Sequence, residues 1–400
     1  MSETIDEQPD RPLLIRVSGT DRPRLTRDLL RLLAAAGAEL EDMEQIVVRE
    51  RLTLDVLVRL SPTADSAGDR LIRDVLFWGF TSGLKVDFEQ VERESKRALL
   101  PRHAVTVLGQ HLTPATLAEV VEAVAVTGGT VDRVVRLATQ PVMAYDLVVI
   151  AGDAAAMRSA LGRVAHDHAV DIAVQDDGLA RRAQRLVVMD VDSTLIQDEV
   201  IELLAEEAGC RDEVAAVTDR AMAGELDFEG SLRARVRLLR GLDSAAIERA
   251  RGRIRLTPGA RTFVATLKRL GYAVAVVSGG FTVFTDRLRD ELALDHAYAN
   301  CLQLVDGVVT GEVVGPVVDR ARKAELLAEI AAAEGVPLSQ TVAVGDGAND
   351  LDMLAAAGLG IAFNAKPTVK SQADTTVSVP YLDAILFMLG LRGVDVERAE

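Results

Sequence analysis

Two carboxylates directly after a short apolar run are the strongest chemical feature of this sequence. Asp190 follows the four apolar residues 186–189, and Asp192 lies two positions further on. A run of this kind, bounded by polar residues, is typical of a buried strand. Because ligands in open α/β sheets bind at the carboxyl ends of parallel strands, both acids are expected where chemistry occurs. One can attack a phosphorus atom while the other moves a proton, provided that a metal ion offsets the phosphate charge.

Two further expected strands also end in polar clusters. The apolar stretch 272–277 precedes Ser278-Gly279-Gly280, and the stretch 341–344 precedes residues 345–350, which include Asp346, Asn349 and Asp350. Gly-Asp-Gly is often only a turn, and Ser-Gly-Gly often only begins a helix. All three clusters occur in this order with Lys323 between the second and third, and we interpret them together as one active site.

The pattern around these clusters predicts the fold that brings them together. From Leu186 onward, apolar strands alternate with longer helical patterns, and a further strand is expected over 359–363. This order favours a parallel sheet covered on both faces. The helical stretch of about 200–255 is too long for a simple crossover, so we expect a cap over the strand ends. Residues 305–308 read as a purely structural Asp-Gly turn between two short strands.

The N-terminal part of the chain contains a diverged repeat. Pro23 and Pro114, like Gly37 and Gly128, are separated by 91 residues. In each copy a strand precedes an amphipathic helix, which a glycine ends; in the first copy two strands, a helix and a strand follow. The repeat predicts two similar βαββαβ units rather than one large domain.

The C-terminal half, about residues 185–395, resembles the haloacid dehalogenase-like phosphohydrolases. The resemblance lies in Asp190-x-Asp192-x-Thr194, then Ser278, Lys323, and Gly345-Asp346-Gly347-x-Asn349-Asp350. It implies a Rossmann-like parallel sheet with a cap insertion. Within that superfamily the chain is most similar to the phosphoserine phosphatases. The narrower similarity lies in residues 190–194, Glu199, the Phe228/Arg235 pair and residues 277–281.

The resemblance assigns the carboxylates distinct roles. It implies that Asp190 attacks phosphorus and that Asp192 first protonates the leaving oxygen and then deprotonates a water molecule. Mg²⁺, which prefers oxygen ligands, would be held by the carboxylates of Asp190 and Asp346 and by the backbone carbonyl of Asp192. Asp350 would hold water molecules or neighbouring ligands in place.

The transferring phosphoryl group needs donors for its oxygens. The resemblance implies that Ser278, the backbone N–H of Gly279 and Lys323 bind them, with Ser278 and Lys323 counted as catalytic. Gly279 allows a close backbone approach, and Lys323 also tempers repulsion between the acids. Asn349 would hydrogen-bond the phosphate or the substrate.

The expected cap would choose the substrate. Glu199 would accept a substrate ammonium, Arg235 would grip a carboxylate in bidentate fashion, and Met222 and Phe228 would close an apolar wall. Together with a phosphate site, these groups describe a phosphorylated amino acid. The alternative for Arg235 is a solvated basic helix face, because residues 233, 237 and 240 are also arginines.

The two N-terminal units, residues 12–88 and 103–178, resemble ACT domains, which are small regulatory modules that commonly bind amino acids. The most specific piece is Gly19-Thr20-Asp21-Arg22-Pro23, and the second copy departs from it over residues 109–114. The resemblance implies an amino-acid effector and a homodimer. The alternative is that both units are pairing or docking modules with no ligand.

Composition narrows the remaining classes. The formal net charge is −16, which argues against nucleic acid as a partner because phosphate-binding surfaces need clustered Lys and Arg. The acidic N-terminus has no apolar core typical of a signal peptide, and no apolar run approaches a bilayer-spanning length. The two cysteines have no metal-ligand spacing and fit a reducing compartment. We therefore expect a cytoplasmic protein without a membrane partner.

The expected activity is Mg²⁺-dependent hydrolysis of O-phospho-L-serine to L-serine and phosphate through an aspartyl-phosphate, the last step of serine biosynthesis. Two alternatives stay open at this point. One is the same chemistry on another small phosphorylated metabolite, such as phosphothreonine or a sugar phosphate. The other is an amino-acid-sensing regulator with an inactive phosphatase domain.

Overall fold

The computed structural model describes residues 12–60, 65–91, 100–178, 181 and 183–396. The side chains of residues 65–67 and of Met222 are outside that description. The chain divides into two compact units, residues 1–99 and 100–400, and each is described by itself. Within the described part, no helix is both long and apolar enough to cross a lipid bilayer.

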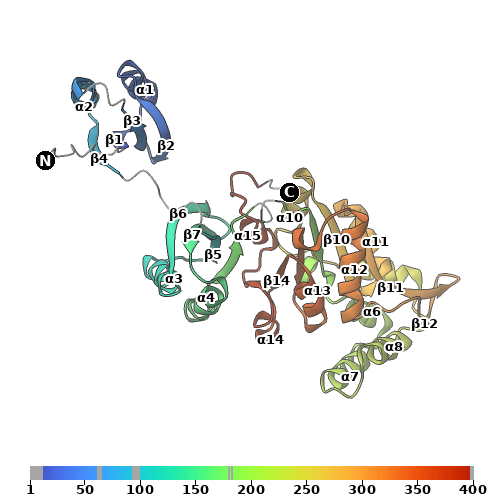
Figure 1. Cartoon of the computed structure of the whole chain (residues 1–400). Helices are drawn as coiled ribbons and strands as arrows, with labels where there is room; N and C mark the ends of the chain where they lie inside the picture. Colours follow the sequence, from blue (N-terminus) through green and yellow to red (C-terminus); the bar gives the residue numbers. More distant parts are fainter. Residues whose placement is uncertain (1–11, 61–64, 92–99, 179–180, 182, 397–400) are drawn as a thin grey trace. The chain divides into compact units, whose positions relative to one another are not determined.

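The first unit is a four-stranded antiparallel sheet with two helices (Figure 1). Its elements are β1 (Leu13–Thr20), α1 (Leu25–Ala35), β2 (Glu39–Val48), β3 (Arg51–Arg59), α2 (Asp65–Ser82) and β4 (Lys85–Gln90). The strand order is β2-β3-β1-β4. Alternate residues of β1, such as Ile15 and Val17, are fully buried beneath Leu29 and Leu33 of α1. The predicted βαββαβ order is confirmed.

The second unit begins with the same arrangement. Its elements are β5 (Arg102–Gly109), α3 (Pro114–Val126), β6 (Gly129–Ala138), β7 (Met143–Ala151), α4 (Ala154–His168) and β8 (Asp171–Asp176), with strand order β6-β7-β5-β8. Val120 and Val124 of α3 are buried, as expected of the predicted amphipathic helix. Val121 is 42% exposed, so the apolar face of this helix is narrower than its sequence indicates.

A seven-stranded sheet forms the centre of the remaining chain, in the order β12-β11-β10-β9-β13-β14-β15. The strands are β9 (Leu186–Met189), β10 (Ala273–Phe281), β11 (His296–Val305), β12 (Val308–Val314), β13 (Thr341–Gly345), β14 (Leu359–Phe363) and β15 (Thr375–Val377). All neighbouring pairs are parallel except β11 and β12. β9 therefore lies between β10 and β13, and the three predicted polar clusters meet at one edge.

Helices cover both faces of this sheet, as predicted. They are α10 (Ala260–Arg269), α11 (Thr282–Leu292), α12 (Arg320–Ala333), α13 (Leu351–Ala356), α14 (Pro367–Lys370) and α15 (Ile385–Met388). The four side chains of β9 are fully buried. Val187 and Met189 belong to the cluster with α10 and α11, whereas Leu186 and Val188 belong to the cluster with α12. A strand buried on both faces explains the uninterrupted apolar run in the sequence.

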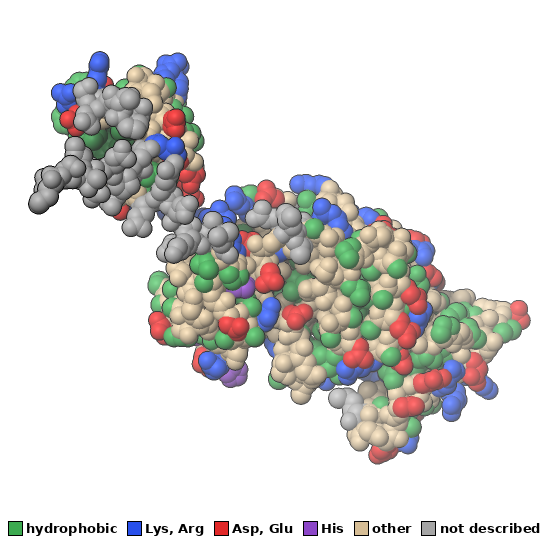
Figure 2. Space-filling model, in the orientation of Figure 1, with side chains coloured by type: hydrophobic (Ala, Val, Ile, Leu, Met, Phe, Trp, Pro, Cys, Tyr) green, Lys and Arg blue, Asp and Glu red, His purple; other side chains and the backbone are tan. Residues whose placement is uncertain are grey.

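Between β9 and α10 the chain forms a helical cap, which confirms the predicted insertion. Its helices are α6 (Val200–Ala208), α7 (Arg211–Met222), α8 (Phe228–Leu238) and α9 (Ser244–Arg251). Asp227 and Asp243 accept hydrogen bonds from Gly230 N and Ala246 N and so begin α8 and α9. Acidic and basic side chains lie intermixed over the cap in Figure 2.

The second βαββαβ unit is joined to the seven-stranded sheet by buried polar contacts. The Asp171 carboxylate, at the start of β8, accepts hydrogen bonds from the Thr376 hydroxyl at 3.0 Å and from Ser378 N at 2.7 Å. Gln175 Nε2 donates to the carbonyl of Met388 at 2.9 Å. Ala173 of β8 shares one apolar cluster with residues of the seven-stranded sheet, such as Val187 and Met189. These contacts make residues 100–178 part of the same packed body as the sheet.

Replacing Asp171 by Ala is expected to destabilise the second unit by about 1–3 kcal/mol, because Ser378 N loses its buried acceptor. Burial raises the pKa of Asp171, so its contribution to folding is largest in acid and falls as the pH rises through the folded pKa. Asp171→Asn, which keeps an acceptor without a charge, is expected to cost less at neutral pH. Urea unfolding checks both, with exposed Asp167→Ala as control; equal effects of the two alanine variants would contradict this account.

Candidate active site

The first carboxylate of the site is fixed at the carboxyl end of β9. Asp190 is 4% exposed, and its Oδ1 accepts a hydrogen bond from Val191 N at 2.8 Å. The chain then turns through one π-helical turn, Val191–Leu195, in which Ser193 has a φ of 58°. The hydroxyl of buried Thr257 donates to the carbonyl of Thr194 at 2.6 Å and holds the turn down. The strand and turn thus hold Asp190 at the sheet edge with little freedom to move.

The second carboxylate points into the same pocket from a different direction. Asp192 Oδ1 accepts from Val200 N at 2.8 Å, and Oδ2 accepts from the Ser278 hydroxyl at 3.1 Å. Ser278 Oγ in turn accepts from Gly280 N at 2.8 Å. Burial, together with the charge of Glu199, raises the pKa of Asp192 to about 7. A carboxyl group with this pKa can hold or release a proton near neutral pH.

Lys323 lies beneath the pocket between two carboxylates. Its Nζ is 2.8 Å from Asp190 Oδ1 and 2.7 Å from Asp350 Oδ1, and the side chain is 1% exposed. Burial alone would lower the pKa of Lys323, but the two carboxylates outweigh it and raise that pKa. The ammonium is therefore charged, and it holds the carboxylates of Asp190 and Asp350 in place.

Three carboxylates at this edge have the chemistry of a divalent-cation site. One oxygen from each of Asp190, Asp346 and Asp350 lies within 4.8 Å of the others. Burial and the charge of Asp350 raise the pKa of Asp346 to about 6, and the same causes raise that of Asp190. Lys323 alone does not balance three acids, and an oxygen-binding cation such as Mg²⁺ would. The residues present therefore fit the predicted metal.

Asp350 is the least available of these three acids. It is fully buried, with Oδ1 bound to Lys323 and Oδ2 accepting from Gly347 N at 3.0 Å. Asp346, by contrast, lines the pocket, and within the described residues it accepts one hydrogen bond, from the Thr194 hydroxyl at 3.3 Å. This difference favours Asp346 as a direct ligand and Asp350 as the residue that orients its neighbours.

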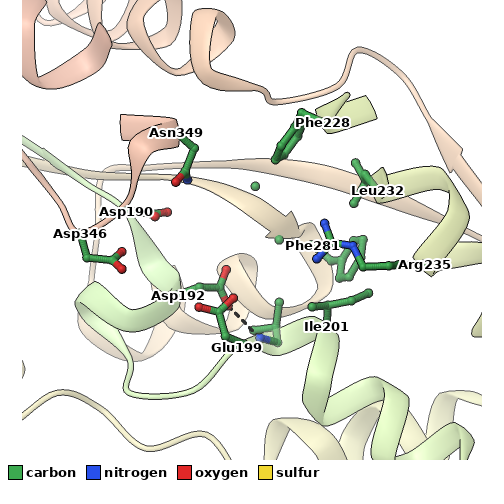
Figure 3. Close-up of a pocket in the computed structure, with 13 residues that line it drawn as sticks. Asp190, Asp192, Glu199, Ile201, Phe228, Leu232, Arg235, Phe281, Asp346 and Asn349 are labelled. Atoms are coloured by element: carbon green, nitrogen blue, oxygen red, sulfur yellow. Dashed lines mark hydrogen bonds between the residues drawn. The ribbon is translucent and has the colours of Figure 1, made fainter. Parts of the chain in front are cut away.

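The carboxylates open into a pocket of about 210 Å³ beneath the cap (Figure 3). Its predicted lining residues are Asp190, Asp192, Glu199, Phe228, Arg235, Gly279, Asp346 and Asn349. Asp190, Asp346 and Asn349 lie on one side, and Arg235 lies across the pocket near Phe281. A Cβ on Gly279 would lie 3.3 Å from Phe228 Cζ, so the glycine leaves room for the cap side chain. The pocket therefore has an acidic end and a basic, aromatic end.

The cap supplies one cation and one anion to this pocket. Arg235 is half-buried, and burial lowers its pKa while the charges of Glu199 and Asp192 act in the opposite direction. Its guanidinium faces the pocket, so the solvated-face alternative is wrong for this residue. Glu199 Oε1 accepts from the Ser193 hydroxyl at 2.8 Å at the start of α6. Met222, predicted to line the site, ends α7, and its side chain lies outside the described residues.

Curated relatives of the chain span almost its whole length. It is 53% identical over 388 residues to a phosphoserine phosphatase of Streptomyces coelicolor, which covers 97% of this chain and 94% of the relative. The chain belongs to the phosphoserine phosphatase family. Phosphoserine phosphatase SerB2 of Mycobacterium tuberculosis, another member, is 46% identical over 97% of this chain and 95% of its own length.

Three family models match this chain, one for each of its three sheets. Residues 187–355 match the haloacid dehalogenase-like hydrolases, and residues 11–89 and 101–175 each match an ACT domain. A solved probable phosphoserine phosphatase from Vibrio cholerae covers 76% of this chain and 90% of its own, with 36% identity and a TM-score of 0.59. The chain is therefore a haloacid dehalogenase-like hydrolase with two ACT domains, and both predicted family resemblances are confirmed.

Several residues that line the pocket could not be identified from the sequence alone. Ile201, Leu232 and Phe281 line the pocket and have no predicted role. Leu232 lies three positions before Arg235 in α8, and residues with this spacing lie on the same face of a helix. This spacing was the one indication in the sequence that Leu232 would also face the pocket. Apolar residues with this spacing are far more often core residues, and nothing in their type distinguishes them.

Proposed function

We propose that this protein hydrolyses O-phospho-L-serine to L-serine and inorganic phosphate through a phosphorylated Asp190. One observation carries the proposal: a single pocket holds the Asp190/Asp192 pair, Glu199 beside Asp192, and Arg235 across from these acids. The Asp190/Asp192 pair suits phosphoryl transfer. Arg235 and Glu199 suit the carboxylate and ammonium of an amino acid.

In the first step, a carboxylate oxygen of Asp190 attacks phosphorus, and the bond between phosphorus and the serine oxygen breaks. Asp192 gives its proton to that oxygen, which leaves as the hydroxyl of serine. Its pKa of about 7 supports this role, because the protonated form is populated near neutral pH. The N–H of Gly279, the Ser278 hydroxyl and Lys323 would bind the phosphoryl oxygens.

In the second step, a water molecule attacks the phosphorus of the phosphorylated Asp190. Asp192, now ionised, accepts a proton from the water, and the bond between phosphorus and the Asp190 oxygen breaks. Phosphate leaves, and both carboxyl groups return to their starting states. One residue serves as acid and then as base, which its contacts with Val200 N and Ser278 allow because they fix its position throughout.

We propose that Asp190 and Asp346 hold Mg²⁺ through their carboxylates and Asp192 through its backbone carbonyl. When bound, the ion supplies positive charge that offsets the repulsion between the phosphate and the attacking carboxylate. Asp350 and Lys323 support the arrangement from below through their 2.7 Å contact. Asn349, on the pocket wall, is placed to hydrogen-bond the phosphate or the serine moiety.

We propose that Arg235, at the basic end of the pocket, binds the substrate carboxylate and that Glu199, beside Asp192, binds the ammonium. Phe228 and Phe281 give this end apolar walls. The proposal places the enzyme at the last step of serine biosynthesis, where the phosphate ester is removed.

We also propose that the ACT domains bind an amino acid such as serine and that the protein is a homodimer. The buried junction at Asp171 bears on the first idea, because it would couple a ligand bound in the second ACT domain to the catalytic sheet. Exposed apolar side chains on β2, an edge strand of its sheet, support the second: Leu40, Met43, Ile46, Val47 and Val48. Serine-binding calorimetry and sedimentation equilibrium test these two statements.

A phosphate-release screen over phosphorylated metabolites, with and without Mg²⁺, tests the proposed function. We expect phosphoserine to give the highest kcat/KM, with phosphothreonine, phosphoethanolamine and sugar phosphates at least about tenfold lower. Chelation should abolish release, and Mg²⁺ should raise the Tm of the wild type more than that of Asp346→Asn. A sugar phosphate as the best substrate, or a rate independent of added metal, would contradict the proposal.

A further inference from the structure

The hairpin formed by β11 and β12 contacts both the strand that carries Ser278 and Gly279 and the cap that carries Arg235. β11 runs parallel to β10, and Phe281 pairs with Asn300 just beyond the phosphate-binding residues. Asn300 is fully buried. Its Nδ2 donates to the carbonyl of Gly279 at 2.8 Å, and its Oδ1 accepts from Val318 N at 2.8 Å. The base of the hairpin is thus tied to Gly279, the residue whose N–H is proposed to bind the phosphate.

The far end of the same hairpin is tied to the cap by backbone hydrogen bonds. Gly241 N donates to the carbonyl of Val309 at 2.9 Å, and Val309 N donates to the carbonyl of Leu242 at 2.8 Å. Ser244 N donates to the carbonyl of Gly307, in the turn, at 2.8 Å. The segment between α8 and α9 therefore pairs with β12 almost as another strand would.

Two arginine side chains, one in α8 and one just after it, complete this attachment. Arg240 Nε donates to the carbonyl of Thr310 at 2.9 Å, and Arg233 Nη1 donates to the carbonyl of Val313 at 3.2 Å. Leu232 and Arg235, from the same helix, line the pocket instead. α8 therefore uses one side to hold the hairpin and another to present Arg235.

Gly311 of β12 packs closely against the end of α8 and the residues that follow it. It is buried, and a Cβ there would lie 3.2 Å from Arg240 Cβ and 3.3 Å from Arg237 Cα. Its φ of 87° is in the region that favours glycine. A larger residue at this position would push the backbone of α8 away from the hairpin by a few tenths of an ångström.

We propose that the β11–β12 hairpin is a positioning element that fixes Arg235 relative to Ser278 and Gly279. It would thereby select substrates by the separation between their phosphate and carboxylate groups. The inference rests on the proposed function, since it requires Arg235 to bind a substrate carboxylate. The sequence predicted the Asp-Gly turn of this hairpin, residues 305–308, to be purely structural. In this proposal the turn also helps to determine substrate specificity. Gly311 acts through Arg235 and does not itself touch the substrate.

Gly311→Ala tests this proposal, with Gly315→Ala as its matched control. Both glycines have positive φ, 87° and 79°, but a Cβ on Gly315 meets nothing within 4 Å. We expect Gly311→Ala to raise the KM for phosphoserine about tenfold with little change in kcat, because a shift of about 1 Å can cost about a hundredfold. Inorganic phosphate, which occupies only the phosphate end, should inhibit with an unchanged Ki. Gly315→Ala should behave as the wild type in both measurements.

Two further variants keep the outcome decisive. Arg240→Ala removes the contact with Thr310 without backbone strain, and it should raise the same KM by a smaller factor. Arg235→Ala removes the guanidinium itself and should raise the KM for phosphoserine by about a hundredfold, the largest effect expected in this series. If Arg235→Ala raises the KM while Gly311→Ala and Arg240→Ala match Gly315→Ala, the hairpin proposal is wrong and the proposed function stands. If Arg235→Ala leaves the KM unchanged, the phosphoserine assignment fails, and the hairpin proposal fails with it.

Discussion

Asp190→Asn should lower kcat for phosphate release by about 10⁴-fold or more, because an amide cannot serve as the attacking nucleophile. The substitution is close to isosteric, and its carbonyl oxygen can still accept from Val191 N and Lys323. The fold and the pocket shape should therefore survive. Initial rates with saturating phosphoserine and Mg²⁺ measure the effect, with circular dichroism to verify folding.

Asp212→Asn provides a control for the loss of a carboxylate, since Asp212 is exposed in the first turn of α7. It should retain the rate of the wild type. Phosphate release by Asp190→Asn within tenfold of the wild type would show that the phosphoryl group does not pass through this residue.

Asp192→Asn should lower kcat for phosphoserine by about 10²–10⁴-fold, the usual contribution of a general acid–base group. An amide can still accept from Val200 N and can donate to Ser278 Oγ, so the loss is one of proton transfer. The serine oxygen leaves poorly without a proton, whereas p-nitrophenolate needs none. The effect on the first step should therefore depend strongly on the leaving group.

Rapid-quench kinetics separate the two roles of Asp192. With p-nitrophenyl phosphate, Asp192→Asn should release about one equivalent of p-nitrophenol quickly and then turn over slowly, because the water-activating base is missing. Equal slowing of both substrates with no burst would contradict the proposed acid and base roles of Asp192. Asp198→Asn, which removes a carboxylate paired with Arg255 outside the pocket, is the control.

The meeting of Asp190, Ser278 and Asp346 could be predicted from the sequence because of one geometric rule. Each follows, or lies near the end of, an apolar strand, and carboxyl ends of adjacent parallel strands meet at one sheet edge. The structure places β9 between β10 and β13, as this rule requires. The assigned strand β10 continues to Phe281, so Ser278 and Gly279 lie within it and not after it.

Other contacts could not be predicted, because they join segments that are far apart in the sequence and that no motif or hydrophobic repeat relates to each other. Asn300 reaches Gly279 across a strand pair, and Gly311 meets α8 only because the cap folds back onto the hairpin. Asp171 looks like an ordinary polar residue at a strand end, yet Thr376, its partner, is 205 positions away. Whether a polar group is buried depends on how distant segments pack together, and the local pattern of apolar residues does not indicate this.

The most direct measurement follows the phosphoryl group itself. Wild-type protein mixed with ³²P-labelled phosphoserine and Mg²⁺, quenched in acid within milliseconds and digested, should yield one labelled peptide. We predict that this peptide contains Asp190 and that hydroxylamine removes the label, as it does from an acyl phosphate. Label on another residue, or phosphate release at the full rate with no labelled peptide at any time, would contradict the account.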